Sequence, residues 1–547
     1  MARKLVRAFG ATAVLAAVLA GCASTDKADD DKSGDATKSG DDAAVVITVG
    51  TTDKVFSLDP AGSYDNGSFA VMNQIYPFLL NTAIGAEDMT PQPDIATSAE
   101  FTAPTQYTVK LKEGLTFANG NKLTSSDVKF SFDRMVSIAD ANGPSSLLGS
   151  LESVEAPDDL TVVFNLKAPN DQTFPGVLTS PVGPIIDEEV FPADSVLADA
   201  DIAKSGAFAG QYSIDTYRPG ELISFKPFDG YNGMLGKAQN TGASVKYYAD
   251  ATNMKLDIER GNIDVAYRSL SATDTESLRS KDNVQVIEGP GGEIRYMVFN
   301  FDTNPYGAKT ADADPAKAVA VRQAIADVID RAAIAKDVYK DTYTPLYSYI
   351  PAGVPDAVET FKTSYGDKKG GPDVAAAKAR LEAAGVTVPV ELKLQYNPDH
   401  YGPSSGDEYA AYKSQLEASG LFKVDLQSTE WVQYNKDRVS DVYPIHQLGW
   451  FPDYSDPDNY ITPFFMTGNF VANHYENAEV DKLIKEQVAT PDAAERADKL
   501  KKIQELVTEE ISTLPLLQGK QFAYAGKDVK GVALDASFKL RIASVSK

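Results

Sequence analysis

Cysteine and histidine are scarce in this chain. Its 547 residues include one cysteine, Cys22, and three scattered histidines, His400, His446 and His474. A single cysteine cannot form an intramolecular disulfide, so stability must come from a buried core, which a chain of this length can supply. There is no HExxH motif, no cysteine and histidine cluster and no histidine pair at i, i+4. No zinc or nickel site built from the chain is therefore expected, and each histidine is interpreted as a surface or core residue.

Positive charge is also in deficit. Lysine and arginine total 52 against 77 aspartate and glutamate, which gives a net charge of -25. Nucleic acids and anionic membrane surfaces are bound through clustered lysine and arginine, so the body of the protein is expected to bind neither. Beyond Leu19 no apolar run approaches the roughly 18 residues that a membrane-spanning helix needs. The 43% hydrophobic and 24% charged content is instead typical of a globular protein.

The N-terminus has the pattern of a secretory signal peptide over residues 1–21. Arg3, Lys4 and Arg7 precede an apolar stretch that begins at Ala8 and is too short to span a bilayer. Leu19-Ala20-Gly21-Cys22 follows and resembles the lipobox of bacterial lipoproteins. This resemblance implies that Cys22 carries a lipid that anchors the protein to the extracytoplasmic face of the cell membrane. The alternative is an ordinary signal peptide in which the cysteine occurs by chance.

Residues 22–44 are predicted to form a disordered tether. Residues 23–44 contain no aromatic or large aliphatic side chain, so they cannot offset the conformational entropy lost on ordering. A flexible chain of this length has an average reach of about 25 Å, enough to hold a globular body just off a bilayer.

From residue 45 onward, strand and helix patterns alternate. Short apolar or period-2 segments predict strands at 45–50, 107–111 and 390–396. Capping residues and helical periodicity predict helices at 128–136 after a Thr124 and Asp127 capping box, 315–339, 372–384 and 491–511. About 500 residues exceed what one core usually holds, so a mixed α/β body of two or more lobes is expected.

Two short segments invite a catalytic or an ion-binding interpretation. Gly402-Pro403-Ser404-Ser405-Gly406 fits G-x-S-x-G, but a nucleophile elbow needs a strand before the first glycine, and here Asn397-Pro398-Asp399 precedes it. A surface turn is favoured over a surface hydrolase using Ser404. Asp453, Asp456 and Asp458 lack the glycine and glutamate of an EF-hand, and 456–458 is interpreted as a turn. There is also no glycine-rich phosphate loop.

The densest unusual stretch is 449–460, Gly-Trp-Phe-Pro-Asp-Tyr-Ser-Asp-Pro-Asp-Asn-Tyr, which contains one of two tryptophans. Aromatic walls beside a carboxylate suit a ligand with a cationic head and a partly apolar body, because the rings exclude water and strengthen the charge interaction. An aromatic loop pinned by aspartate turns explains the same residues equally well.

From about residue 45 to the C-terminus the chain resembles the family 5 extracytoplasmic solute-binding proteins, the oligopeptide, dipeptide and nickel receptors of ABC importers. The first matching motif is Leu58-Asp59-Pro60. Further matches follow in the expected order at 106–117, 120, 123–128, 210–212, 217–220, 261–264, 298–300, 321–324, 329–331, 350–353 and 450–457. A dozen ordered matches are more specific than any single motif.

The resemblance implies an α/β fold, a two-lobed periplasmic-binding-protein-like clamshell of type II with an extra subdomain inserted in lobe I. Lobe I is expected at 45–87, 207–298 and 518–547, the inserted subdomain at 88–206 and lobe II at 299–517. The hinge crossings are expected near 296–300 and 514–518, extended segments able to absorb rotation.

The resemblance also implies a ligand site and no catalytic residue, cofactor or metal. Asp453 is expected to accept the ligand's α-ammonium, Trp450 to line a side-chain pocket, and the backbone at Gly449 and Phe451 to pair with an extended peptide. The loop after the Leu-Asp-Pro motif is expected to face the cleft with Tyr64, Asp65, Asn66, Gly67 and Ser68. Arg322 and Asp330 are explained by salt bridging or helix capping and stay outside the site.

The expected function is that of a monomeric, membrane-tethered receptor that binds a short peptide and presents it to ABC permease subunits. Oligopeptide receptors carry a basic residue just before the Gly-Trp pair, where this chain has His446-Gln447-Leu448. No carboxylate-binding arginine is evident there. A peptide ligand is favoured, and an oligosaccharide, an opine or a metal chelate remains the alternative.

Overall fold

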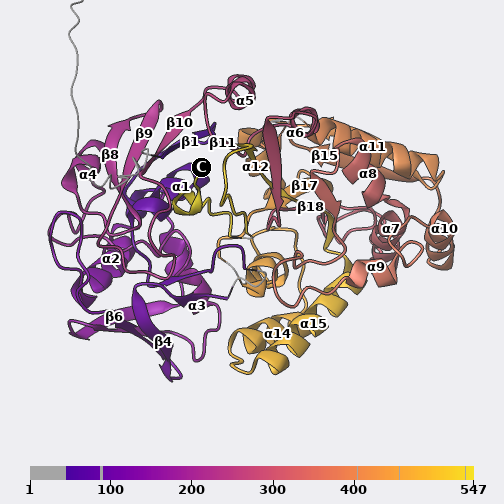
Figure 1. The fold of residues 1–547 in the computed structure, drawn as a ribbon. Coiled ribbons are helices and arrows are strands. Elements are labelled where there is room, and N and C mark those ends of the chain that lie inside the picture. The colour runs from indigo at the N-terminus through magenta and orange to yellow at the C-terminus, as the bar shows by residue number, and fades with distance from the viewer. Residues whose placement is uncertain (1–44, 87–89, 399, 403, 455, 536) are drawn as a thin grey trace, which may run out of the picture. The chain divides into compact units, whose positions relative to one another are not determined.

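The computed structural model describes residues 45–547 except 87–89, 399, 403, 455 and 536 (Figure 1). The predicted signal peptide, the tether and Cys22 therefore lie outside the described residues. The chain divides into two units, 1–43 and 44–547, and the fold below is that of the second. This unit is mixed α/β, as the alternating sequence patterns predict.

A seven-stranded sheet gathers strands from the beginning, middle and end of the chain. Its spatial order is β12 (Val284–Gly289), β19 (Gln521–Gly526), β11 (Val265–Tyr267), β1 (Val46–Thr51), β10 (Gly242–Tyr247), β9 (Leu222–Pro227) and β8 (Tyr212–Arg218). In the described sheet the two parallel pairs are β1 with β10 and β1 with β11, and the other pairs are antiparallel. The helices that pack on it are α1 (Asn66–Ile75), α4 (Asp199–Ser205), α5 (Ala251–Arg260) and α6 (Ala272–Arg279). All these strands come from the segments predicted for lobe I.

A four-stranded antiparallel sheet lies within the range predicted for the inserted subdomain. Its order is β4 (Ala96–Ala103), β5 (Gln106–Leu111), β7 (Thr161–Leu166) and β6 (Leu151–Asp158). Helix α2 (Ser125–Ile138) packs on β6 and β7 and buries Val128 and Phe132. The predicted capping box is present. The Thr124 hydroxyl accepts from the backbone N–H of Ser126 at 3.2 Å, and the Asp127 carboxylate accepts from the backbone N–H of Thr124 at 2.8 Å. Local hydrogen bonds thus fix where this helix begins.

A six-stranded sheet carries the second half of the chain. Its order is β14 (Tyr343–Pro345), β18 (Thr513–Gly519), β13 (Ile294–Phe299), β17 (Ile445–Trp450), β15 (Val390–Tyr396) and β16 (Phe422–Ser428). Its helices are α7 (Pro315–Val328), α8 (Arg331–Asp337), α9 (Thr360–Ser364), α10 (Val374–Ala383), α11 (Ser405–Ala418), α12 (Trp431–Arg438), α13 (Thr462–Phe465), α14 (Ala478–Val488) and α15 (Ala493–Glu510). Figure 1 shows α14 and α15 side by side, and they pack on each other. Short elements complete the fold: β2 (Leu80–Asn81), β3 (Gln92–Pro93) and α3 (Phe174–Val177).

The helix predicted at 315–339 is two helices, which corrects the sequence prediction. Ile329 leaves the helical conformation with ψ 119° at the end of α7. Asp330 then accepts a hydrogen bond from the Ala333 backbone N–H and caps α8. Asp330 is thus a helix cap, while Arg322 donates to the Glu510 carbonyl at 2.9 Å and lies over the Phe301 ring. Asp330 has the capping role that the sequence indicated, whereas Arg322 is held by a backbone carbonyl and an aromatic ring rather than by a salt bridge among the described residues.

The segments predicted as hinges, 296–300 and 514–518, lie largely within strands of the six-stranded sheet. They form most of β13 and β18, which pair with each other antiparallel and are almost completely buried. The chain passes between the seven-stranded and six-stranded sheets at 290–293 and again at Lys520, the residues between β12 and β13 and between β18 and β19. The boundary predicted at 298 and 299 falls inside β13. Among the described residues, no helix combines the length and apolar character needed to cross a bilayer.

Candidate ligand-binding site

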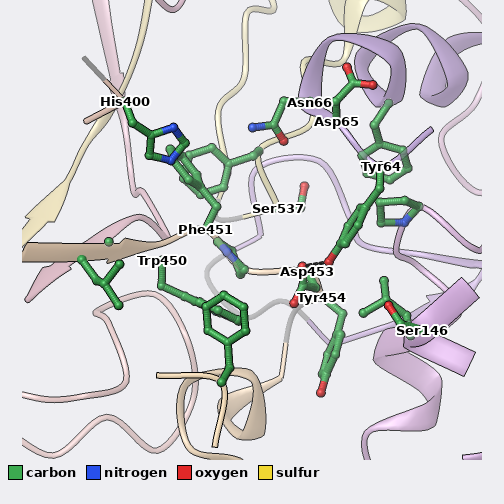
Figure 2. Close-up of a pocket in the computed structure, with 18 of the residues that line it drawn as sticks. Tyr64, Asp65, Asn66, Ser146, His400, Trp450, Phe451, Asp453, Tyr454 and Ser537 are labelled. Carbon is green, nitrogen blue, oxygen red and sulfur yellow. Dashed lines mark hydrogen bonds between the residues drawn. The ribbon is translucent and has the colours of Figure 1, made fainter. Parts of the chain in front are cut away.

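A cavity of about 600 Å³ lies where loops of the two large sheets and of the four-stranded sheet's subdomain meet (Figure 2). One wall comes from the loop before α1 and its first residues, from 146–147 and 179–181, and from the C-terminal segment 537–539. The other wall comes from 400–401, α12, the end of β17 and the loop that follows it. The volume lies in the range of small-molecule sites, and the lining is rich in aromatic side chains.

The loop after β17 is held in place by Asn459 in the 3₁₀ helix η3 (Pro457–Tyr460). Its Oδ1 accepts from the indole N–H of Trp450 and from the backbone N–H of Asp453, both at 3.0 Å. Its Nδ2 donates to the Asp453 carboxylate at 3.2 Å. Asp456 anchors η3 in turn, because its carboxylate accepts from Arg496 at 2.7 and 2.8 Å and caps the helix. The aspartate turns thus position Trp450 and Asp453 together.

Asp453 is the acidic group at the centre of the site. The hydroxyl of Tyr64, from the loop before α1, donates to its other carboxylate oxygen, as Figure 2 shows. Burial raises the pKa of the Asp453 carboxyl, and the hydrogen bonds from Tyr64 and Asn459 partly oppose that rise. A desolvated carboxylate of this kind gains from a cationic partner that restores the lost interaction with water.

Seven of the nine residues predicted for the ligand site line this cavity. They are Tyr64, Asp65, Asn66, Gly449, Trp450, Phe451 and Asp453. Trp450 packs edge-on against Phe464 and Phe470, with ring centroids 5.4 and 5.5 Å apart. At Gly449 an added Cβ would lie 3.0 Å from the Tyr401 ring, so glycine allows that ring to lie against β17.

Gly67 and Ser68 do not line the cavity. Both are buried in the first turn of α1. A Cβ on Gly67 would lie 2.0 Å from the Lys54 carbonyl oxygen, so the glycine serves close backbone packing. The Ser68 hydroxyl accepts from the backbone N–H of Phe56 at 2.8 Å and of Ser57 at 3.2 Å. Both residues therefore pack α1 against the loop that precedes it.

Two buried basic residues that the sequence did not indicate also line the cavity. Arg438, on α12, is 4% exposed, donates to Asn435 at 2.7 Å and lies over the Phe470 ring. Lys539 is 3% exposed and donates to the Thr179 carbonyl at 2.8 Å, and burial lowers its pKa to about 7. Among the described residues neither cation forms an ion pair with a carboxylate.

Aromatic residues missed by the sequence analysis complete the lining: His400, Tyr401, Trp431, Phe470 and Phe538. The His400 and Trp431 rings stack with centroids 3.8 Å apart and an angle of 7° between their planes. Trp431 is the second of the chain's two tryptophans. That scarcity is the one sequence signal that could have pointed to α12.

Residues 90–471 match the family described as bacterial extracellular solute-binding proteins, family 5. The match covers more than half of the chain. The chain belongs to this family.

Relatives of this family 5 solute-binding protein extend along most of its length. The probable D,D-dipeptide-binding periplasmic protein DdpA of Escherichia coli is 26% identical over 502 residues, covering 89% of this chain and 91% of that protein. The dipeptide-binding protein DppE of Bacillus subtilis is 24% identical, with 95% and 94% covered. The ABC transporter substrate-binding protein CtaP of Listeria monocytogenes superposes with a TM-score of 0.77 at 20% identity, covering 92% of this chain and 99% of that one. The fold is therefore the two-lobed α/β fold predicted from the sequence.

The G-x-S-x-G match has no elbow geometry in this family 5 protein. Strand β15 ends at Tyr396, several residues before Gly402, and Ser404 immediately precedes α11. Gln447 donates to the hydroxyl of the neighbouring Ser405 at 3.2 Å, which fixes the start of that helix. The relatives described above are solute-binding proteins.

Asp302, Asp441 and His474 bring their side-chain ligand atoms within 4.8 Å of one another. Lys309 donates to Asp302 at 2.8 Å and lies 3.7 Å from Asp441. The lysine ammonium thus already supplies the positive charge that this pair of carboxylates attracts, and the group is explained as a surface charge network.

His446 is buried behind the site, and we expect it to make the protein acid-sensitive. Burial, reinforced by Arg438, lowers its pKa to about 3, and neither ring nitrogen has a hydrogen-bond partner among the described residues. An unfolded histidine protonates near pH 6.5, so between about pH 6.5 and 3 the unfolded chain binds a proton that the folded chain does not. As the pH is lowered through this range, this histidine therefore lowers the free energy of unfolding by about 1.4 kcal/mol per pH unit.

His446→Leu should remove that contribution. Urea unfolding from about pH 7 to about pH 4.5 should show the variant gaining stability relative to the wild type as the pH falls. A constant difference between the two proteins across this range would contradict the prediction.

Proposed function

We propose that this protein is a lipid-anchored extracytoplasmic receptor that captures short peptides at Asp453 and delivers them to an ABC import permease. Its family consists of extracellular solute-binding proteins, and two of the relatives described above are named for dipeptide binding. In this proposal Cys22 carries the lipid, residues 22–44 tether the body, and the receptor acts as a monomer. Lobe I (45–87, 207–298 and 518–547), with its inserted subdomain (88–206), closes on lobe II (299–517) around the ligand.

The observation that carries the proposal is the charge pattern of the cavity. Asp453 supplies a partly desolvated carboxylate, and Arg438 supplies a buried cation without a carboxylate partner among the described residues. Lys539 supplies a buried amine whose pKa of about 7 would rise beside a ligand carboxylate. Leaving a charge buried and unpaired is costly, so a ligand that neutralises both poles gains affinity. A short peptide has these two poles, an α-ammonium and a carboxylate.

The end of β17 supports recognition of a peptide backbone. The ladder between β15 and β17 contains the pairs Leu394 with Ile445 and Gln395 with His446, and it extends no further toward the cavity. Residues 448–450 therefore have a strand partner on the β13 side alone in the described sheet. An extended ligand can add main-chain hydrogen bonds at such an edge, which favours peptide length over side-chain identity.

Isothermal titration calorimetry with dipeptides tests the ligand class. Because the ammonium is expected to sit at Asp453, N-acetylation should weaken binding by at least about 30-fold, the effect of losing one desolvated charge contact of about 2 kcal/mol. Native mass spectrometry of the purified protein supplies an independent readout. Equal affinity for free and acetylated dipeptides would refute the ammonium role, and a co-purified oligosaccharide, opine or metal chelate would replace the peptide.

A further inference from the structure

A second, smaller cavity of about 230 Å³ adjoins the first. Tyr401, Phe451 and Phe538 line both cavities, so these three side chains form the wall between them. The second cavity is otherwise lined by residues absent from the first, among them Arg268, Glu293, Lys520 and Phe522. The two cavities are thus lined by different residues except at Tyr401, Phe451 and Phe538, and these three side chains are called the partition below.

The partition closes through a contact between opposite sides of the site. Phe451 follows β17, whereas Phe538 lies in the C-terminal segment beyond β19. Their rings meet edge to face with centroids 5.5 Å apart. Phe451 is 38% exposed, so its ring is not locked in a core and can turn aside; Figure 2 shows it next to Trp450 at the wall of the first cavity.

Phe538 is held in an unfavourable backbone conformation. Its φ is +58°, in the left-handed region where a bulky side chain is uncommon and glycine is unstrained. Its carbonyl accepts from the Tyr267 hydroxyl at 3.3 Å, which helps to hold the turn. A large ring at a position suited to glycine points to a role for the ring itself.

The far side of the partition carries two cationic side chains, Arg268 and Lys520, and one carboxylate, Glu293. The Arg268 guanidinium lies 5.6 Å from the centroid of the Phe451 ring and lines the second cavity. Its nearest carboxylate, Asp53, is 3.5 Å away. Lys520 lines the same cavity and pairs with Glu288 at 3.2 Å. A peptide that holds its α-ammonium at Asp453 and extends through the partition would bring its C-terminal carboxylate toward Arg268. Each charged end of the peptide would then meet a side chain of opposite charge.

We propose that Phe451 and Phe538 form an aromatic gate that sets the length of the ligand. With the rings in contact the site accepts the shortest peptides in the first cavity. When the rings part, the two cavities join and a longer peptide places its C-terminal carboxylate beside Arg268. Each extra residue adds about 3.3–3.6 Å of extended chain, so the partition is met within the first few residues. This inference rests on the peptide-binding function proposed above.

Calorimetry with alanine peptides of two to five residues tests the gate. Phe538→Gly removes the ring and suits the left-handed backbone, and Phe451→Ala removes the partner from an exposed loop position. In both variants the ratio of the pentaalanine Kd to the dialanine Kd should fall by about tenfold relative to the wild type. Phe56→Ala is the matched control, because it removes a ring that is 63% exposed and lines neither cavity; its ratio should not change. In Phe538→Gly, amidation of the pentaalanine C-terminus should weaken binding, and adding Arg268→Gln should abolish that difference.

The outcomes separate this inference from the function beneath it. If the wild type binds dialanine but neither gate variant shifts the length ratio, or if Phe56→Ala shifts it equally, the gate is wrong while the receptor function stands. If neither the wild type nor any variant binds an alanine peptide, the peptide-binding function fails and the gate falls with it.

Discussion

Asp453→Asn is expected to weaken peptide binding by about 30-fold to several thousand-fold, the cost of about 2–5 kcal/mol for removing one partner of a desolvated charge pair. Asparagine keeps the size of the side chain and can still bond to Tyr64 and Asn459, so the loop after β17 should retain its conformation. What is lost is the negative charge that would face the ligand's ammonium. Titration calorimetry with a free dipeptide measures the loss directly.

The acid dependence of binding gives this prediction a second readout. Since burial raises the pKa of the Asp453 carboxyl, the free protein takes up a proton there at a higher pH than an exposed aspartate would. That proton competes with the ammonium, so wild-type affinity should fall as the pH is lowered through this range. Asp453→Asn should lack this dependence, while the contribution of Lys539, which lines the same cavity and whose pKa burial lowers to about 7, is common to both proteins.

Asp528→Asn is the matched control, since it removes the same charge from a side chain that is 70% exposed and absent from the cavity lining. It should leave dipeptide affinity unchanged. If Asp453→Asn binds a free dipeptide as tightly as the wild type, the assignment of Asp453 to the ligand's ammonium is wrong.

The parts of the structure that local interactions determine could be predicted from the sequence. The start of α2 follows from the Thr124 and Asp127 capping box, and β15 follows from alternating apolar residues. The long helix expected at 315–339 failed because apolar residues continue through Ile329, while the break depends on Asp330 capping a second helix. The resemblance placed the hinge crossings near 296–300 and 514–518, but these residues belong mostly to β13 and β18, which are neighbouring antiparallel strands of the six-stranded sheet. The chain passes between the two large sheets a few residues away, at 290–293 and at Lys520.

The candidate site was only partly predictable, because it joins segments distant in the chain. The resemblance pointed to Asp453 and its neighbours, but Arg438, Lys539 and Phe538 give no local signal. Their significance lies in burial, in missing charge partners and in contact with the cavity, which exist only in the folded chain. Gly67 and Ser68 show the converse case, since residues next to a site motif serve the docking of α1.

The Leu58-Asp59-Pro60 motif also has a structural role, and breaking its ion pair should cause the largest loss of stability. Asp59 and Arg134 pair through two hydrogen bonds of 2.6 and 2.8 Å with side chains 0% and 1% exposed. Asp59 also accepts from the backbone N–H of Ala61 and Leu197, and Arg134 donates to the carbonyls of Pro192 and Ser195. The pair therefore ties the motif, α2 and the 192–197 loop together.

Arg134→Met should lower the unfolding free energy by about 3–5 kcal/mol, because it leaves the Asp59 carboxylate buried without a cation. Urea denaturation followed by circular dichroism measures this loss. Glu391→Gln, which breaks the exposed pair with Lys423, should change stability by less than about 1 kcal/mol. The double variant Asp59→Asn with Arg134→Met should recover part of the loss, since no charge then remains buried alone. A single variant as stable as Glu391→Gln would show that the motif owes nothing to this ion pair, and strictly additive losses in the double variant would show that the two side chains act independently.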